Sequence, residues 1–252
     1  MSRRLVVVPS TLFSPRTVEA VPSNRAALER LRSELEVSVY TWPYMDGGPQ
    51  VSATWQGEVT ALRELLAEDC HVLSFGGTAA LAIVAISGCK SVRSLTCDGM
   101  FPPPATLRRL GQHSAAEAAE VTIRASRIGL SQYVRYLLPQ GSAGEISQFI
   151  ELMDRDIDWA REQEHANSYA SLDLVQENVL VEVPALCLQL PIAIAGYDED
   201  GAILKRFVPR VAVEPFEPWG FNDSAGGARL AERVLRFVGE VEQERSQAGQ
   251  AG

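Results

Sequence analysis

Strand-like runs and amphipathic stretches alternate along the first part of the chain. The strand-like runs, whose apolar content is typical of a buried parallel sheet, cover residues 5–8, 36–42, 70–74 and 92–97. Apolar residues at helical spacing follow the first three runs, from residue 23, over residues 55–67 and over residues 78–86. This alternation predicts a mainly parallel sheet that is covered by helices on both faces.

The alternation stops at three consecutive prolines, residues 102–104. The patterns that follow are helical only, over residues 106–111, 115–128, 131–138 and 145–164, and strand-like spacing returns near Val179. We therefore expect a core domain made of residues 1–101 and 172–242, into which residues 102–171 are inserted as a helical cap.

Residues 70–85, CHVLSFGGTAALAIVA, predict a strand that runs through a tight glycine turn into a helix. This segment resembles the part of the α/β-hydrolase family that carries the catalytic nucleophile. The order of the other elements is also similar to that family, in which a helical lid enters after the strand that follows the nucleophile helix. The resemblance covers nearly the whole chain and implies an α/β-hydrolase-like fold, with a mainly parallel sheet, flanking helices and a helical cap insertion.

The family places a serine at the centre of a G-x-S-x-G turn, and this chain allows two registers. If Ser74 replaces the first glycine, the central position is Gly76 and the turn carries no nucleophile. If Ser74 is itself the central residue, Val72 stands where a glycine is expected. We favour the first register because it leaves residues 70–73 as a continuous apolar strand end.

A serine nucleophile also needs a base, which the family supplies as a histidine near the C-terminus. The histidines of this chain are His71, His113 and His165, and none lies in its last third. In residues 218–222, PWGFN, the position of the family's histidine falls on Phe221, which cannot move a proton. The resemblance therefore implies a degenerate catalytic triad.

Side chains that follow the strands are the candidates for a site, because ligands of open α/β sheets bind at the carboxyl ends of the strands. Asp98 directly follows a strand-like run and is the first candidate for a proton-handling acid. Ser74 is a candidate nucleophile, and His113, like His165, is a candidate base in the cap. The expected substrate-binding residues are Ser10, Thr11, Trp42, Tyr44, Phe75, Gly76, Gly77, Trp219 and Phe221.

Several of these candidates have a structural alternative. Asp98 would alternatively cap a turn with Gly99, and Ser10 with Thr11 would form a plain turn. Two further aromatic candidates, Trp42 and Tyr44, would belong to a packed loop. The glycine turn at residues 76–77 offers backbone N–H groups, either to a developing negative charge or to a bound anion.

Composition narrows the function classes. The 252 residues are 46% hydrophobic and 22% charged, with a net charge of -9, which argues against a nucleic-acid partner. The pattern shows no signal peptide and no membrane span, so we expect a cytoplasmic protein. Its preference for arginine over lysine is typical of a GC-rich bacterial genome. The polar residues 243–252 are expected to form a disordered tail.

The four cysteines, Cys70, Cys89, Cys97 and Cys187, lack C-x-x-C spacing and are expected to be reduced, with no metal and no cofactor bound.

We predict a non-hydrolytic enzyme that binds a small hydrophobic, carbonyl-containing metabolite. It would catalyse cyclisation, carbon–carbon bond formation, elimination or isomerisation in secondary metabolism. One alternative is an inactive binding or scaffold protein, and another is an esterase or thioesterase that uses Ser74. The oligomeric state stays open.

Overall fold

The computed structural model describes residues 3–128, 130, 134–135, 142–189, 197–198, 201–217 and 223–250. Within these residues a six-stranded sheet has the order β2-β1-β3-β4-β5-β6, and every neighbouring pair is parallel. The strands are β1 (Arg4–Val8), β2 (Glu36–Val39), β3 (Cys70–Ser74), β4 (Val92–Cys97), β5 (Ala185–Gln189) and β6 (Val211–Pro215). The predicted mainly parallel sheet is confirmed.

The central strands are the continuous apolar runs of the sequence. Leu5 to Val8 in β1 and all of β3 are buried, because helices cover both faces of the sheet at this point. The register pairs Val8 with Ser74 and Ser74 with Cys97, so β1, β3 and β4 end side by side. The edge strands β2 and β6 are only partly buried.

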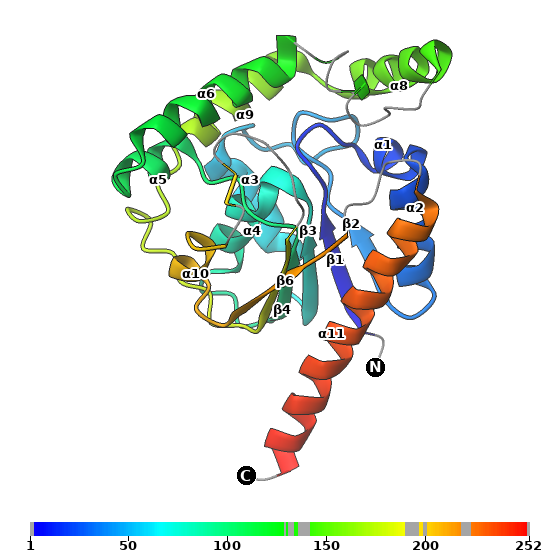
Figure 1. Ribbon diagram of the computed structural model, residues 1–252, viewed down its shortest axis with the longest axis vertical. Helices are drawn as coiled ribbons and strands as arrows, with labels where there is room; N and C mark the ends of the chain where they lie inside the picture. Colours follow the sequence, from blue (N-terminus) through cyan, green and yellow to red (C-terminus); the bar gives the residue numbers. More distant parts are fainter. Residues whose placement is uncertain are drawn as a thin grey trace.

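Two groups of helices sandwich the sheet (Figure 1). The helices α1 (Pro15–Ala20), α2 (Pro22–Arg32) and α11 (Ser224–Gln250) lie on one face, whereas α3 (Trp55–Leu65) and α4 (Ala79–Ile86) lie on the other. Helix α11 packs closely on α2 at Gly227, where a Cβ atom would lie 1.9 Å from the Ser23 carbonyl oxygen. A short helix, α10 (Leu204–Phe207), precedes β6.

Much of the described chain between β4 and β5 is helical, and these helices lie beyond the carboxyl ends of the strands (Figure 1). They are α5 (Pro104–Arg109), α6 (His113–Ile128), α8 (Ala143–Asp156) and α9 (Trp159–Ala170). The helical cap insertion of the predicted fold class is confirmed. The helix predicted over residues 131–138 lies almost entirely outside the described residues.

One predicted cap helix, residues 145–164, is in fact two helices. The break falls at Ile157, which pairs with Met45 in an antiparallel bridge, and at Asp158, whose carboxylate accepts hydrogen bonds from the first backbone N–H groups of α9. Helical periodicity continues across the break, so the sequence pattern did not show it. The break matters because it lets the cap contact the loop that follows β2.

The polar C-terminal residues were predicted to form a disordered tail, but α11 continues through them to Gln250. Residues 243–249 are exposed and are rich in Glu, Gln, Arg and Ala, which favour a helix without any packing partner. The end of α11 projects away from the sheet (Figure 1). No helix among the described residues is long and apolar enough to cross a membrane.

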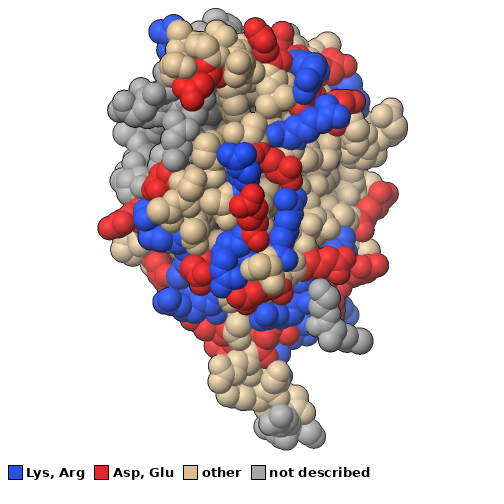
Figure 2. Space-filling view, turned by 90° about the vertical axis from the view of Figure 1, so that its right-hand side faces the viewer, with Lys and Arg blue, Asp and Glu red and all other residues tan. Residues whose placement is uncertain are grey.

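Charges of both signs are interspersed on the face that Figure 2 shows. Ion pairs also connect neighbouring helices, as between Arg30 of α2 and Glu232 of α11, whose atoms are 2.6 Å apart. Opposite charges that pair in this way leave no large field of one sign on this face.

Candidate functional site

The strand ends that were expected to converge do so at one edge of the sheet, here called the carboxyl edge. Phe75 leaves β3 with its N–H bonded to the Val8 carbonyl oxygen at 2.9 Å, so the turn after β3 lies beside the end of β1. Asp98 follows Cys97, which is paired with Ser74. The turn after β3 and the acid after β4 therefore stand next to each other, below the cap.

Ser74 belongs to the strand and not to the turn. It is the last residue of β3, none of it is exposed, and its Oγ lies 2.9 Å from Thr78 Oγ1. Phe75 is still extended, and a single 3₁₀ turn, η1 (Gly76–Thr78), follows it and leads into α4. This arrangement agrees with the first of the two registers, in which glycine takes the central position of the turn.

Asp98 lies at a tight corner and is 7% exposed. The next residue, Gly99, has φ +105, and a Cβ atom there would lie 1.7 Å from the Tyr197 hydroxyl oxygen, so glycine is required. That hydroxyl donates a hydrogen bond to the Asp98 carbonyl oxygen. Asp198, the other acid of the corner, caps α10, because its carboxylate accepts from the N–H groups of Ile203 and Leu204 at 3.1 and 2.8 Å.

A histidine and a glutamate meet inside the protein above these strand ends. His165 of α9 and Glu58 of α3 are 4% and 1% exposed, and His165 Nδ1 lies 2.7 Å from Glu58 Oε1. Burial raises the pKa of Glu58, an effect that the charge and the hydrogen bond of His165 partly oppose. The second carboxylate oxygen of Glu58 has no hydrogen-bond partner among the described residues.

Aromatic rings enclose this pair. The ring centroids of Tyr44, Trp42 and Tyr169 lie 5.0, 5.9 and 5.9 Å from that of His165. Burial raises the pKa of the Tyr44 and Tyr169 hydroxyls, which therefore stay protonated and act as donors. We call Trp42, Tyr44, Glu58, His165 and Tyr169 the His165 cluster.

The His165 cluster connects the cap to the strand ends. The Tyr44 hydroxyl donates to the Thr11 carbonyl oxygen at 2.8 Å. The Tyr169 hydroxyl lies 2.6 Å from the Phe101 carbonyl oxygen and 3.0 Å from that of Gly77, in the turn after β3. A displacement of α9 would therefore change the contacts of the turn after β3.

The structure groups the predicted site residues unevenly. Trp42 and Tyr44 are fully buried in the packed His165 cluster, whereas Ser10, Thr11, Phe75 and Gly77 are partly buried at the carboxyl edge. Gly76 lies in η1, and Trp219 and Phe221 lie outside the described residues. Of the two cap histidines, His113 is exposed at the start of α6, and it is His165 that lies in the cluster.

Sequence reasoning missed Glu58 and Tyr169. Glu58 lies next to Val59 and four residues before Leu62, so a charged residue interrupts the apolar face of α3. His165 and Tyr169 are also four residues apart, which places them on one face of α9. A charge on a buried helix face and a polar pair at helical spacing are the signals that could have pointed to this cluster.

The cysteines in this region are thiols inside the sheet. Cys97 and Cys187 are partners in the register of β4 and β5, and a mutual hydrogen bond together with burial raises the pKa of Cys97. A thiol of this kind is a poor nucleophile. Within the described part of the chain, no group of three or more His, Cys, Asp or Glu side chains is placed to hold a metal ion.

Comparisons with known proteins support the fold. No protein-family model matches the sequence, and no curated protein matches it significantly. A solved hydrolase from Oleispira antarctica is similar over 94% of this chain and 91% of its own, with 13% identity and a TM-score of 0.67. A haloalkane dehalogenase loop variant from Bradyrhizobium elkanii (98% and 92% covered, 13% identity, TM-score 0.63) and an enol-lactonase from Burkholderia xenovorans (94% and 92%, 15%, 0.59) are also similar. The chain therefore has the α/β-hydrolase fold.

Proposed function

We propose that this protein is an enzyme of the α/β-hydrolase fold that does not use a serine nucleophile. The turn after β3 carries the proposal. Ser74 is enclosed in the strand with its hydroxyl directed to Thr78, and glycine occupies the turn. A hydroxyl held in this way cannot reach the carbonyl carbon of a bound substrate, because attack needs contact between the two atoms.

The groups at the carboxyl edge suit a small hydrophobic metabolite that contains a carbonyl. Cyclisation, carbon–carbon bond formation, elimination and isomerisation of such a compound can all begin with removal of a proton from the carbon beside the carbonyl. The Asp98 carboxylate takes this proton, and the electrons of the broken C–H bond form an enolate whose negative charge lies on oxygen. Backbone N–H groups of the turn after β3 stabilise that charge. The reaction needs no cofactor.

An inactive binding or scaffold protein is the second candidate. One observation favours it: Trp42 and Tyr44, which were expected to line a substrate pocket, are packed inside the His165 cluster. An esterase or thioesterase is the weaker alternative, since the Ser74 hydroxyl would first have to leave Thr78 and then find a base. No described histidine contacts Ser74.

The first experiment tests the nucleophile. We expect no covalent labelling of the folded wild-type protein by a fluorophosphonate probe and no hydrolysis of p-nitrophenyl butyrate above the Ser74→Ala background. Circular dichroism shows that the protein is folded in both assays. Stoichiometric labelling that Ser74→Ala abolishes would overturn the proposal in favour of the esterase.

The second experiment tests proton removal. A panel of hydrophobic ketones, such as 1-tetralone and longer aryl alkyl ketones, is incubated with the protein in D₂O, and deuterium at the α-carbon is followed by NMR. We expect protein-dependent exchange for at least one ketone, a loss of at least 100-fold in Asp98→Asn, and no change in Ser74→Ala. Exchange that survives in Asp98→Asn would remove Asp98 from the mechanism. Saturable ketone binding without exchange would favour the binding protein.

A further inference from the structure

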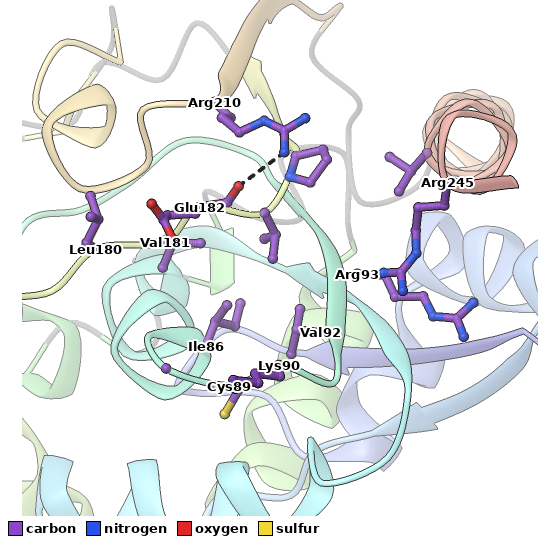
Figure 3. A pocket seen from close by; sticks show the side chains of 14 residues that line it. Ile86, Cys89, Lys90, Val92, Arg93, Leu180, Val181, Glu182, Arg210 and Arg245 are labelled. Atoms are coloured by element: carbon purple, nitrogen blue, oxygen red, sulfur yellow. Dashed lines mark hydrogen bonds between the residues drawn. The ribbon is translucent and has the colours of Figure 1, made fainter. Parts of the chain in front are cut away.

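A pocket of about 480 Å³ opens at the end of the sheet opposite to the candidate site (Figure 3). Its walls come from the end of α4, the start of β4, the segment before β5 and one side of α11. Val92 is the first residue of β4, and Pro184 and Arg210 directly precede β5 and β6. The pocket thus lies at the amino ends of the strands, and no residue of the proposed function lines it.

Much of the lining is apolar. The size of the pocket falls in the range of small-molecule sites, which combine an apolar wall with a few polar groups that fix orientation. The apolar lining residues are Ile86, Val92, Leu180, Val181, Val183, Pro184 and Val241. Among them, Leu180, Val183 and Pro184 are exposed or partly exposed, and the other four are buried beneath the surface of the pocket. A ligand with an apolar body would be removed from water against this wall.

Cations dominate the charged part of the lining. Lys90, Arg210 and Arg245 are exposed, and none of them forms an ion pair with a described residue. Figure 3 shows them on three different sides of the pocket. A fourth cation, Arg93, is engaged by Asp69 and Glu242. These three cations without a described ion-pair partner stand out in a chain with a net charge of -9.

The one carboxylate of the lining does not neutralise them. Glu182 is exposed, and its contact with Arg210 is made by the backbone, since Arg210 Nη1 lies 3.4 Å from the Glu182 carbonyl oxygen. The Arg210 guanidinium therefore keeps donors that can bind an oxyanion, and planar guanidinium groups match carboxylate and phosphate oxygens well.

We propose that this pocket binds an amphiphilic oxyanion, whose carboxylate or phosphate head contacts Lys90, Arg210 and Arg245 and whose apolar body lies along Leu180, Val183 and Pro184. The site is separate from the carboxyl edge and does not depend on the proposed reaction. Its charge selects the head, and its apolar wall selects against small inorganic anions.

The test is isothermal titration calorimetry of the whole chain with dodecanoate and dodecyl phosphate, each below its critical micelle concentration. We expect one site per chain, and weakening by about tenfold in the triple variant Lys90→Gln, Arg210→Gln, Arg245→Gln, because each exposed charge pair contributes about two- to threefold. Arg25→Gln removes an exposed charge on α2, away from the pocket, and should change nothing. Added salt should weaken wild type more than the triple variant.

Three results would decide against this site. Equal affinity in wild type and triple variant, binding of many amphiphiles per chain, or no binding of either probe would overturn the proposal. If dodecanoate binding were lost in Asp98→Asn but kept in the triple variant, the ligand would bind at the carboxyl edge and not in this pocket. That result would contradict the pocket proposal and leave the proposed function standing. Tighter binding of dodecyl phosphate than of dodecanoate would identify a phosphate head, and the reverse a carboxylate.

Discussion

Two buried histidines, one near each end of the sheet, are held in different ways. His165, beyond the carboxyl edge, contacts the buried carboxylate of Glu58 at 2.7 Å inside a ring of aromatic side chains. His71, near the start of β3, contacts the hydroxyl of Ser94 at 2.7 Å, and its other nitrogen lies 3.4 Å from the partly exposed Glu242. Both residues are almost completely buried.

We infer from this difference that the partner of a buried histidine determines how its region responds to pH and to mutation. Burial lowers the pKa of His71 to about 4, because desolvation outweighs the attraction of Glu242 and nearby arginines repel a proton. Beyond the carboxyl edge, the contact with His165 offsets part of the desolvation of Glu58. The stability of the region around His71 therefore depends on a neutral imidazole ring. The stability of the His165 cluster depends on the intact contact between His165 and Glu58.

Breaking the pair should give the largest effect. His165→Ala leaves the Glu58 carboxylate buried without its partner and opens a space among the aromatic rings. We expect the free energy of unfolding to fall by about 3–5 kcal/mol, measured by urea denaturation. His113→Ala, a change of the other cap histidine, which is exposed, should stay within about 0.5 kcal/mol of wild type. Similar decreases in the free energy of unfolding for both variants would mean that the His165–Glu58 contact does not stabilise the protein.

The pH dependence of stability should reveal His71. Its pKa is lower in the folded state, so between pH 6.5 and about 4 the unfolded chain binds the proton more readily, and stability falls as the pH decreases. The loss should reach about 3 kcal/mol over this window. His71→Asn should remove this part of the loss, whereas His113→Asn should keep it. Parallel curves for wild type and His71→Asn would contradict the low pKa of His71.

The main elements of the fold could be predicted from the sequence, but the break inside the cap could not. The central strands were predictable because β1 and β3 are continuous apolar runs bounded by turns, and β3 coincides with the predicted residues 70–74. The cap was predictable because three prolines mark its start. The break at Ile157 was not, since it depends on a bridge to Met45 far away in the sequence.

The site was only partly predictable for the same reason. The rule that ligands bind at strand ends selected Ser10, Thr11, Asp98 and the turn after β3 as candidates at one edge of the sheet, because it needs only the order of the strands. The rule cannot tell which cap residue meets which core residue. The contact of His165 with Glu58 joins α9 to α3, and no local pattern specifies that pairing. Aromatic residues expected to line a pocket were buried by this same contact.

A third experiment separates the acid of the pair from its histidine. The pKa of Glu58 is raised in the folded state, so the native protein holds the proton more tightly than the unfolded chain, and stability contributed by this group is lost as the pH rises above about 4.5. Each unit of the raised pKa corresponds to about 1.4 kcal/mol. The unfolding free energy of wild type relative to Glu58→Gln should therefore fall with increasing pH. A difference that does not change with pH would show that burial has no net effect on Glu58.

Ser74 should give the smallest effect, and it also tests the turn. Ser74→Ala removes one buried hydrogen bond, but the Thr78 hydroxyl keeps its bond to the Phe75 carbonyl oxygen at 2.8 Å, so no donor is left without a partner. We expect a loss of about 1 kcal/mol in urea denaturation. Ser94→Ala is the matched change at the other end of the sheet, and it should cost more because it leaves His71 Nδ1 without its partner. If Ser74→Ala instead left stability unchanged and abolished an ester hydrolysis seen in wild type, Ser74 would be a nucleophile and not a structural hydroxyl.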